Sequence, residues 1–558
     1  MTTLAVRPGF ASRAPRLIRV AVAFGISTIG MTWPVSSSGL RLLPDADDAY
    51  FSVWRLGWVG HQIAADPLQL FNANIFFPTK GTLAYSDAML LLGIIAAPLQ
   101  WAGVHLVAIQ NLLLLLSFVA AGVGAYLLCM RLTGDPLASF LGGFVFAFAP
   151  FRIAHIGHLE LLWTAWMPLS LWLVHALVAS PGVRTGALLG ICVSLQMLCS
   201  IYYGVFLGLY VGLALTALCV VNRRRITRAL LVPTGCAVFV ALVITAPYLV
   251  PYARTSQATG PRSETEVARY SASLSDYARV PAENRLYGRR NAAVAADERS
   301  LMPGALAMAL ASVAVFFARS GTVGLYAVLA AFSLDASLGV HGWTFPALQW
   351  MLPPLQSLRS PARFGVLVLL SVSVLAAIGL KRIFGEGSPR KRAIAFGLAV
   401  VMCAAEYCSV PLGTRAPDMT PHPAYRWLAR LPAQTVVLEL PTPNPSALWL
   451  HETTYQYNST YHWRRLVNGY SGFAPAQYLN TLQSLQSFPD EESVRHLRRL
   501  SVDYVLLHRE YLGEKRYVGL MEHLTRNAAF VGPWTFGAGV ATIQVFQLRD
   551  RGRADESH

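Results

Sequence analysis

Residues 44–51 read PDADDAYF and follow closely on the first apolar stretch of the chain, residues 17–36, in which Arg19 is the only charged side chain. A stretch of about 20 apolar residues is long enough to cross a bilayer. Carboxylates are costly inside lipid, so Asp45, Asp47 and Asp48 are expected at the water boundary beyond this span. They either belong to a site there or only solvate the loop that ends the helix.

The composition of the chain is that of a polytopic membrane protein. Of its 558 residues, 54% are hydrophobic and only 13% are charged, and the mean hydropathy is +0.45. Soluble domains carry roughly 25% charged residues. The net charge of +16 gathers in short basic connectors, among them residues 222–228 and 381–392. The positive-inside rule requires such connectors of cytoplasmic loops, which argues against nucleic acid as a partner.

Hydropathy and charge together predict eleven membrane spans with a cytoplasmic amino terminus. The expected spans are residues 17–36, 105–130, 137–152, 161–179, 186–201, 204–221, 229–248, 304–318, 321–336, 362–380 and 393–410. The membrane domain is then residues 1–410, with its main outer loops at 37–104, 249–303 and 337–361. Residues 88–104 are apolar but short and contain Pro98, so we interpret them as an interfacial or re-entrant helix on the outer side.

Residues 411–558 are predicted to form a water-soluble α/β domain outside the membrane. Residues 435–440 (TVVLEL), 502–508 and 541–548 have the apolar patterns of strands, and residues 490–500 carry alternating charge at helical spacing. The seven cysteines all lie in apolar stretches of residues 1–410, so no disulfide framework is expected in this tail.

The first outer loop continues from the acidic cluster through further polar and aromatic residues. Tyr50, Asn74 and Asp87 are candidate substrate-binding residues in this loop. Its tryptophans, including Trp54 and Trp58, belong either to an aromatic belt or to one or two helices that lie on the membrane surface.

The second outer loop, residues 150–160 (PFRIAHIGHLE), contains imidazole and carboxylate groups. His155 and His158 are three residues apart and share a helix face, so with Glu160 they are candidate ligands of a divalent metal such as Mg or Mn. The alternative is that these side chains form hydrogen bonds to neighbouring loops. Arg152 is a further candidate substrate-binding residue.

The third constellation is LRSPARF at residues 358–364, which leads into the tenth predicted span. Arg359 and Arg363 are four residues apart near a helix start. Guanidinium groups there bind phosphate well, because they pair bidentately and the helix amides add positive potential. The alternative is that both arginines reach from the span to the membrane interface.

With these features the chain resembles the GT-C superfamily of polytopic membrane glycosyltransferases. In that superfamily an acidic residue of the first outer loop often stands in an Asp-x-Tyr-Phe or Asp-x-x-Tyr pattern, and residues 48–51 (DAYF) and 47–50 (DDAY) match these two forms. The resemblance implies a sugar donor linked to a polyprenyl-phosphate-type lipid and a glycan, lipid or protein acceptor of the bacterial cell envelope. It covers the first three spans well and the remainder in layout only.

The chemistry implied by this resemblance is an inverting hexosyl or pentosyl transfer at the outer leaflet of the bacterial inner membrane. Asp48 would act as the general base, with Asp47 or Asp45 as alternatives. Arg359 and Arg363 would stabilise the departing lipid phosphate. Two other classes stay open: a lipid or glycan transporter or flippase, which charges in the middle of the spans would favour, and a non-catalytic protein of envelope assembly.

Overall fold

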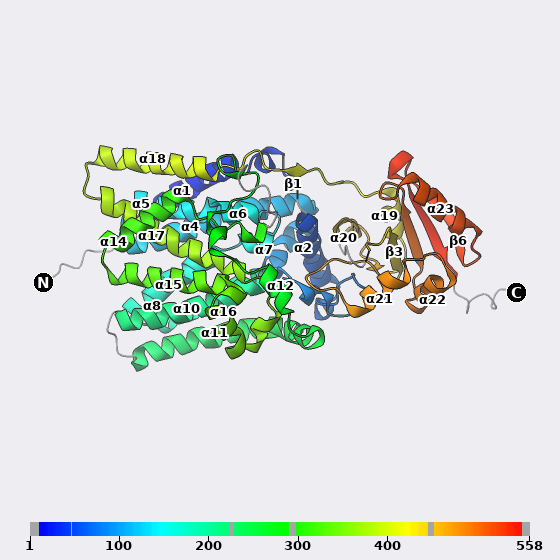
Figure 1. Ribbon diagram of the computed structural model, residues 1–558, viewed down its shortest axis with the longest axis horizontal. Helices are drawn as coiled ribbons and strands as arrows, with labels where there is room; N and C mark the ends of the chain where they lie inside the picture. Colours follow the sequence, from blue (N-terminus) through cyan, green and yellow to red (C-terminus); the bar gives the residue numbers. More distant parts are fainter. Residues whose placement is uncertain (1–9, 46, 222–226, 289–296, 445–450, 550–558) are drawn as a thin grey trace. The chain divides into compact units, whose positions relative to one another are not determined.

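The computed structural model describes residues 10–45, 47–221, 227–288, 297–444 and 451–549 (Figure 1). The contacts divide the chain into two compact units. The helical unit consists of Met1–Asp45 and Gln110–Arg415, and the α/β unit consists of Ala46–Ile109 and Ala416–His558. The fold is mostly helical, with a small sheet in the C-terminal region, as the sequence predicts.

The helical unit contains a helix at each of the eleven predicted spans. These helices are α1 (Phe10–Met31), α4 (Leu106–Thr133), α5 (Pro136–Phe148) with α6 (Pro150–Ala154), α7 (Leu159–Leu162) with α8 (Trp166–Ala179), α9 (Val183–Cys199), α10 (Ile201–Val221), α11 (Arg228–Thr259), α14 (Ala305–Phe317), α15 (Gly321–Ser337), α17 (Gly365–Phe384) and α18 (Pro389–Tyr407). The short helices α12 (Glu264–Arg269) and α16 (Thr344–Met351) lie in predicted outer loops.

Six helical segments of the described chain are long and apolar enough to cross a membrane. They are Leu106–Thr133, Pro136–Ala154, Leu159–Ala179, Ile201–Val221, Arg228–Thr259 and Pro361–Phe384. Three shorter apolar helices of the helical unit, α9, α14 and α15, coincide with further predicted spans. The chain is therefore a multi-pass membrane protein, and the count of eleven crossings stays a prediction.

Helix α17 lies at the centre of the helical unit and packs against α5, α14, α15 and α18. In the most apolar part of the α17 segment 89% of the residues are buried, whereas in that of α11 only 22% are buried. Close packing against α14 depends on Gly379, where an added Cβ would lie 1.9 Å from the Leu310 carbonyl oxygen. The interior of the unit is thus built around α17, and α11 presents most of its surface outward.

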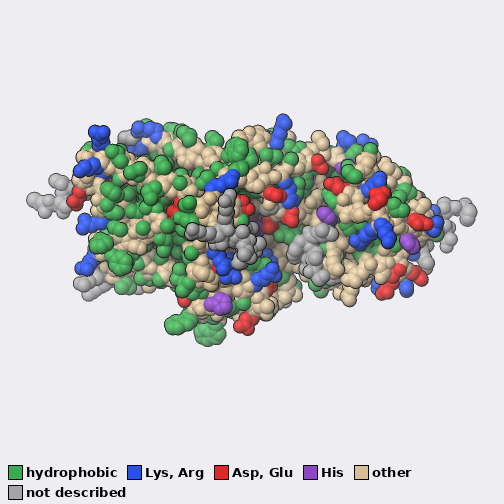
Figure 2. Space-filling view, turned by 45° about the horizontal axis from the view of Figure 1, so that its top comes forward, with side chains coloured by type: hydrophobic (Ala, Val, Ile, Leu, Met, Phe, Trp, Pro, Cys, Tyr) green, Lys and Arg blue, Asp and Glu red, His purple; other side chains and the backbone are tan. Residues whose placement is uncertain are grey.

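The basic connectors gather at one end of the helical unit. Figure 1 shows the turn between α17 and α18 at the same end as the start of α1. Figure 2 shows Lys and Arg side chains at that end and hydrophobic side chains along the helices. Of the predicted connectors, Arg7 and residues 223–225 lie outside the described residues, as do Arg289 and Arg290 of the basic outer loop. Which side of the membrane this end faces stays a prediction.

The α/β unit contains a five-stranded sheet with the strand order β4-β3-β5-β7-β6. The strands are β3 (Val436–Leu440), β4 (Arg465–Leu466), β5 (Tyr504–His508), β6 (Phe530–Phe536) and β7 (Ile543–Leu548). Strand β3 is parallel to both β4 and β5, whereas β7 is antiparallel to β5 and β6. The three predicted strands correspond to β3, β5 and β7, and the predicted helix corresponds to α22 (Glu491–Arg499).

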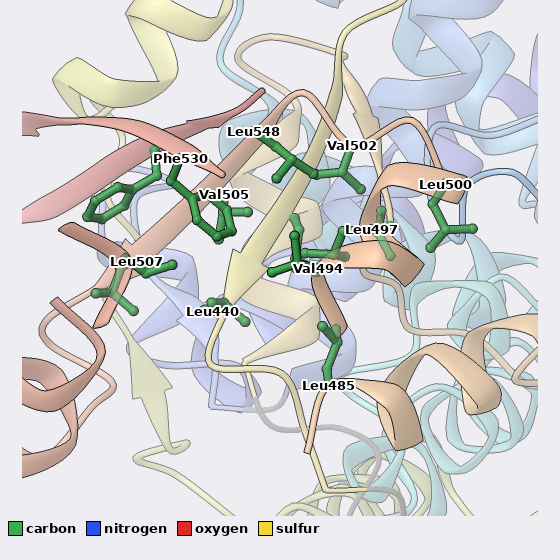
Figure 3. Close-up of a cluster of buried hydrophobic side chains, with 14 of the residues drawn as sticks. Leu440, Leu485, Val494, Leu497, Leu500, Val502, Val505, Leu507, Phe530 and Leu548 are labelled. Atoms are coloured by element: carbon green, nitrogen blue, oxygen red, sulfur yellow. The ribbon is translucent and has the colours of Figure 1, made fainter. Parts of the chain in front are cut away.

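One face of the sheet packs against α22 and α23 (Glu514–Arg526) through a buried apolar cluster that includes Leu438, Leu497 and Leu524. Figure 3 shows part of this cluster, with Leu440 and Leu507 of the sheet and Leu497 of α22 among the labelled side chains. The other helices of this unit are α2 (Asp47–Ala65), α3 (Leu90–Trp101), α19 (Pro423–Leu428), α20 (Glu452–Ser459) and α21 (Ala476–Ser484). The tail therefore has its own hydrophobic core, as its length predicts.

Most of the first outer loop belongs to the α/β unit by its contacts. Helix α2 packs against both α3 and α20. Beyond α2, the chain runs beside β4, where Phe77 N donates to Leu466 O at 2.8 Å and Leu466 N donates to Asn74 O at 2.7 Å. The sequence suggested a boundary near residue 410 and assigned residues 37–104 to the membrane domain. The contacts instead group Ala46–Ile109 with the C-terminal region.

Candidate active site

The acidic cluster opens helix α2. Asp47 and Asp48 occupy the first turn, where the helix dipole favours carboxylates. The phenol of Tyr470 donates a hydrogen bond of 2.8 Å to Asp48 Oδ1. The ring of Tyr470 packs edge-on against Phe51, with 5.1 Å between the centroids. Asp48 is thus oriented by a side chain from the C-terminal region, and the residue stays partly exposed.

Aromatic and imidazole side chains surround this helix start. The buried ring of Tyr50 lies 4.9 Å from that of Tyr457, centroid to centroid. The ring of His451 stacks on Tyr511 at 4.0 Å. Burial lowers the pKa of His451, and the nearby Asp47 carboxylate opposes that shift. The predicted residues Asp47, Asp48 and Tyr50 therefore share their surroundings with groups far away in the sequence.

Glu452, the first residue of α20, is fully buried next to His451. Its carboxylate accepts hydrogen bonds from Asn468 Nδ2 at 3.2 Å and from Gly469 N at 2.6 Å. Burial raises the pKa of Glu452 to about 8, although these two donors favour the charged form. The group therefore holds a proton at neutral pH more readily than an ordinary glutamate.

Asn74 has a well-defined structural role. Its Oδ1 accepts a hydrogen bond from Trp54 Nε1 at 3.1 Å, and its Nδ2 donates to Ser459 Oγ and to the Arg464 carbonyl, both at 3.1 Å. These bonds connect α2, the loop and the end of α20. Because both side-chain polar atoms are engaged within the unit, substrate binding by Asn74 stays a prediction that would require rearrangement.

Asp87 is buried near Arg55, a residue that the sequence analysis did not single out. The carbonyl of Asp87 accepts a hydrogen bond of 2.8 Å from Arg55 Nη1, and Arg55 Nη2 donates to Ser52 Oγ at 3.0 Å. The guanidinium also lies 4.3 Å from the centroid of the Phe51 ring. Arg55 is 1% exposed, two turns along α2 from Asp48, and adds a buried positive charge to this region.

Asp45 differs from the other two carboxylates. It belongs to the helical unit, where β1 (Leu43–Pro44) pairs with β2 (Thr414–Arg415). Its carboxylate forms an ion pair of 2.9 Å with Arg415, and the Asp45 side chain is 54% exposed. A catalytic role for Asp45 stays a prediction, and the ion pair gives this residue a structural explanation.

Arg363 is engaged by a carboxylate that lies 65 residues earlier in the chain, Glu298. Arg363 Nε lies 3.2 and 3.1 Å from the two oxygens of Glu298, and Nη2 makes a further contact. Glu298 also accepts from Ser360 Oγ at 3.2 Å and faces His155 Nε2 at 3.4 Å. Burial alone would raise the pKa of Glu298, but the Arg363 charge and the His155 hydrogen bond hold it well below its usual range.

Arg359 has looser contacts than Arg363. Its Nη1 lies 3.7 Å from Glu266 Oε1, its guanidinium lies 5.1 Å from the Tyr270 ring centroid, and its side chain is 30% exposed. Its backbone N–H donates to Tyr202 Oη at 3.0 Å. The two arginines thus share a segment but not an environment. Both belong to the helical unit, whereas Asp48 belongs to the α/β unit, so a shared site stays a prediction.

The remaining predicted residues of the second outer loop form contacts within the helical unit. Arg152 is 1% exposed, and its guanidinium donates to Thr164 Oγ1 at 2.7 Å and to the Leu162 carbonyl at 2.9 Å. Substrate binding by Arg152 stays a prediction, and these bonds explain the residue as a connection between α6 and α7.

The two histidines of the second outer loop contact other residues of the helical unit, and a metal site there stays a prediction. His155 Nδ1 bonds to the Phe151 carbonyl at 2.8 Å while its Nε2 faces Glu298, so both ring nitrogens are engaged. His158 Nδ1 lies 3.7 Å from Glu160. Within the described ranges, no group of three or more His, Cys, Asp or Glu side chains is arranged to hold a metal ion. These contacts agree with the alternative in which the loop is held by hydrogen bonds.

Two residues important for this geometry were missed in the sequence. Tyr470 lies 422 residues from Asp48, and nothing local marks it. Glu298 is one of six acidic residues in loop 249–303 and directly follows Asp297, so nothing local marks it either.

A model of the family described as a domain of unknown function, DUF6311, matches residues 54–405. The chain belongs to this family. No curated protein sequence matches it. The matched region runs from within α2 to near the end of α18 and includes LRSPARF, whereas α1 and residues 44–51 precede it.

Solved structures with the same fold are GT-C enzymes. The arabinofuranosyltransferase AftD from Mycobacteria is 17% identical with a TM-score of 0.62, over 95% of this chain and 41% of AftD. ArnT from Cupriavidus metallidurans, bound to undecaprenyl phosphate, is 12% identical with a TM-score of 0.53, over 96% and 98% of the two chains. The oligosaccharyltransferase of Archaeoglobus fulgidus is 13% identical with a TM-score of 0.50, over 88% and 70%.

These similarities confirm that the chain has the GT-C fold. At such low identity they establish the fold and leave the reaction open. The chain also spans only about two fifths of the length of AftD. The donor, the acceptor and the residues that act on them therefore have to be argued from this chain's own site.

Proposed function

We propose that this protein is a membrane glycosyltransferase that transfers a sugar from a polyprenyl-phosphate-type lipid to an envelope glycan, lipid or protein at the outer leaflet of the bacterial inner membrane. The observation that carries the proposal is the acidic start of α2 in a chain with the GT-C fold. Asp48 is held there by Tyr470 and remains partly exposed. The fold supports a lipid-linked donor, because ArnT, with the same fold, binds undecaprenyl phosphate.

In the proposed reaction, Asp48 accepts the proton of the acceptor hydroxyl as that oxygen attacks the anomeric carbon. The bond between this carbon and the lipid phosphate breaks, and the configuration inverts. General base catalysis of this kind contributes about 10²–10⁴-fold to the rate. The bond from Tyr470 limits the rotation of the Asp48 carboxylate. Asp47, in the same helix turn, is the alternative base.

The two arginines take different roles in this proposal. Arg363 already pairs with Glu298, so its charge is largely neutralised by the protein. Arg359 has a weaker ion pair and a partly exposed side chain, and it is the better candidate for the contact to the lipid phosphate. Positive charge at this position would stabilise the leaving phosphate as the glycosidic bond breaks. Arg363 and Glu298 then fix the segment that presents Arg359.

The test is loss of a product in cells and consumption of a donor in vitro. Deletion of the gene in the native host should remove a sugar from an envelope glycan or lipid and leave the corresponding polyprenyl-phosphate sugar in excess, both measurable by mass spectrometry. In detergent, where there is no membrane to cross, the purified protein should still consume that donor. A protein that restores the glycan in cells but never consumes the donor in detergent would be a transporter and not a transferase.

A further inference from the structure

An apolar patch stands out on a predicted outer loop of the helical unit. Trp343 and Trp350 are 88% and 84% exposed, and Met351 and Leu352, which follow directly, are 64% and 40% exposed. Trp343 precedes α16, and Trp350 lies in its last turn. Covering a tryptophan removes about 150–250 Å² of surface from water, so two such exposed rings favour contact with something apolar.

The patch is displayed by a well-supported helix. Asp335, near the end of α15, accepts hydrogen bonds from the backbone N–H groups of Trp343 at 3.0 Å and Thr344 at 2.6 Å. Phe345, the second residue of α16, is completely buried, and its ring centroid lies 6.5 Å from that of Phe364. Helix α16 therefore points Phe345 inward and exposes Trp343 and Trp350 on a fixed frame.

The position of the patch in the chain indicates what covers it. Helix α16 lies between the apolar helices α15, which ends at Ser337, and α17, which begins at Gly365. The short helix η7 (Pro353–Ser357) follows the patch and packs against both α16 and α11. Helix α11 is the least buried of the long apolar helices, so the patch continues a surface that faces lipid.

The charges near the patch fit the same occupant. Arg254 is exposed near the end of α11, the helix that packs against η7. The guanidinium of Arg262, which follows α11, instead pairs with Glu266 at 3.0 Å. Tryptophan rings concentrate at the boundary between lipid head groups and acyl chains, and arginines beside them attract anionic head groups.

We propose that α16 is an interfacial anchor that inserts Trp343 and Trp350 into the membrane surface on the side where α15 ends and α17 begins. The occupant of the patch is phospholipid. A direct consequence concerns Arg359, which follows η7 and is therefore held at a fixed depth relative to the head groups. The anchor itself does not depend on the proposed glycosyl transfer.

The first test uses the native full-length protein in nanodiscs of phosphatidylcholine and phosphatidylglycerol. Hydroxyl-radical footprinting measures the oxidation rate of each tryptophan by mass spectrometry. Trp534 of the α/β unit, which is 39% exposed, is the internal control. Without lipid contact, Trp343 and Trp350 should oxidise about twice as fast as Trp534, in proportion to their exposure. Insertion reverses this order, so both should oxidise more slowly than Trp534.

The second test identifies what protects the rings. A phospholipid with a photoreactive diazirine in its acyl chain should label the peptide that contains residues 343–352, and it should also label α11 as a positive control. Oxidation of both tryptophans at or above the Trp534 rate would overturn the proposal. Protection without lipid labelling would overturn it as well and would indicate a second copy of the chain or another protein on the patch.

Discussion

Two glutamates, the part-buried Glu298 and the fully buried Glu452, belong to different units and have opposite surroundings. Glu298 in the helical unit faces the Arg363 guanidinium and His155, and its pKa is held well below the usual range. Glu452 in the α/β unit accepts from the neutral donors Asn468 Nδ2 and Gly469 N, and burial raises its pKa to about 8. Burial penalises both charges, so the presence or absence of a cation decides the direction of the shift.

The same contrast applies to the candidate catalytic groups. In the helical unit the protein itself neutralises Arg363, which leaves Arg359 as the more available cation. In the α/β unit the phenol of Tyr470 donates a hydrogen bond to Asp48 and orients its carboxylate. Arg363 is thus paired with an opposite charge, whereas Asp48 accepts from a neutral donor, and substitutions can test both arrangements.

The largest effect is expected for Asp48→Asn. An amide cannot accept the acceptor proton, so the rate of transfer should fall by about 10²–10⁴-fold. The measurement is donor consumption by purified protein, with the melting temperature as a check on folding. Asp45→Asn is the matched control, because Asp45 pairs with Arg415 at an exposed position, and it should retain nearly full activity. Full activity in both Asp48→Asn and Asp47→Asn would remove the proposed mechanism.

The next effect is on stability. Glu298→Ala leaves the Arg363 charge largely buried without its carboxylate, and removal of one partner of a buried pair typically costs about 3–5 kcal/mol. Thermal unfolding in detergent should show a clear loss. Arg415→Ala breaks the exposed pair with Asp45 and should cost less than about 1 kcal/mol. If Glu298→Ala and Arg415→Ala lost the same amount of stability, the Glu298–Arg363 pair would stabilise the fold no more than an exposed ion pair does.

A smaller effect, on donor use, is expected for Arg359→Lys. Lysine keeps the charge but cannot pair bidentately with phosphate, so we expect roughly a tenfold rise in KM for the lipid donor, about 1.4 kcal/mol, with little change in stability. An arginine that merely reached the membrane interface would tolerate lysine. An unchanged KM would therefore favour the interfacial role and would remove Arg359 from the proposed phosphate site.

Local patterns predicted the elements of this fold but not the contacts between them. Apolar length is a local property, and each predicted span contains a helix. The strands β3, β5 and β7 were predictable because their buried runs are five or six residues long. Strand β4 has only two residues, and β6 contains Pro533 at an irregularity in its pairing with β7, so neither carries the usual pattern.

The acidic motif, similarly, was visible in the sequence, whereas its surroundings were not. The residues 48–51 form a continuous pattern, but Tyr470 reaches Asp48 only through the packing of α2 beside α20. The pairing of Arg363 with Glu298 likewise depends on where a long loop returns to the helices. Such contacts depend on three-dimensional packing, so they cannot be predicted from the spacing of residues in the sequence.

The smallest predicted effect follows from the pKa of Glu452. A glutamate in an unfolded chain has a pKa of about 4.3. In the folded α/β unit the Glu452 carboxyl keeps its proton up to about pH 8. The protonated Glu452 therefore stabilises the folded state fully below the pKa of an unfolded glutamate. This stabilisation is lost as the pH rises through about 8. Glu298 behaves in the opposite way: its charge stabilises the fold above the unfolded pKa, and this stabilisation is lost as the pH falls through its lowered pKa.

Glu452→Gln should therefore flatten the pH dependence of the α/β unit between pH 6 and 9. The amide oxygen can still accept from Gly469 N, and the side chain carries no proton that high pH removes. Hydrogen exchange of the peptide covering α20, corrected for intrinsic rates, should show protection that declines with pH in the native protein and stays level in the variant. Glu298→Gln serves as the control, because its titration lies outside this window and the decline should persist. An equal decline in Glu452→Gln would assign the pH dependence to another group and would leave the contrast between the two glutamates unsupported.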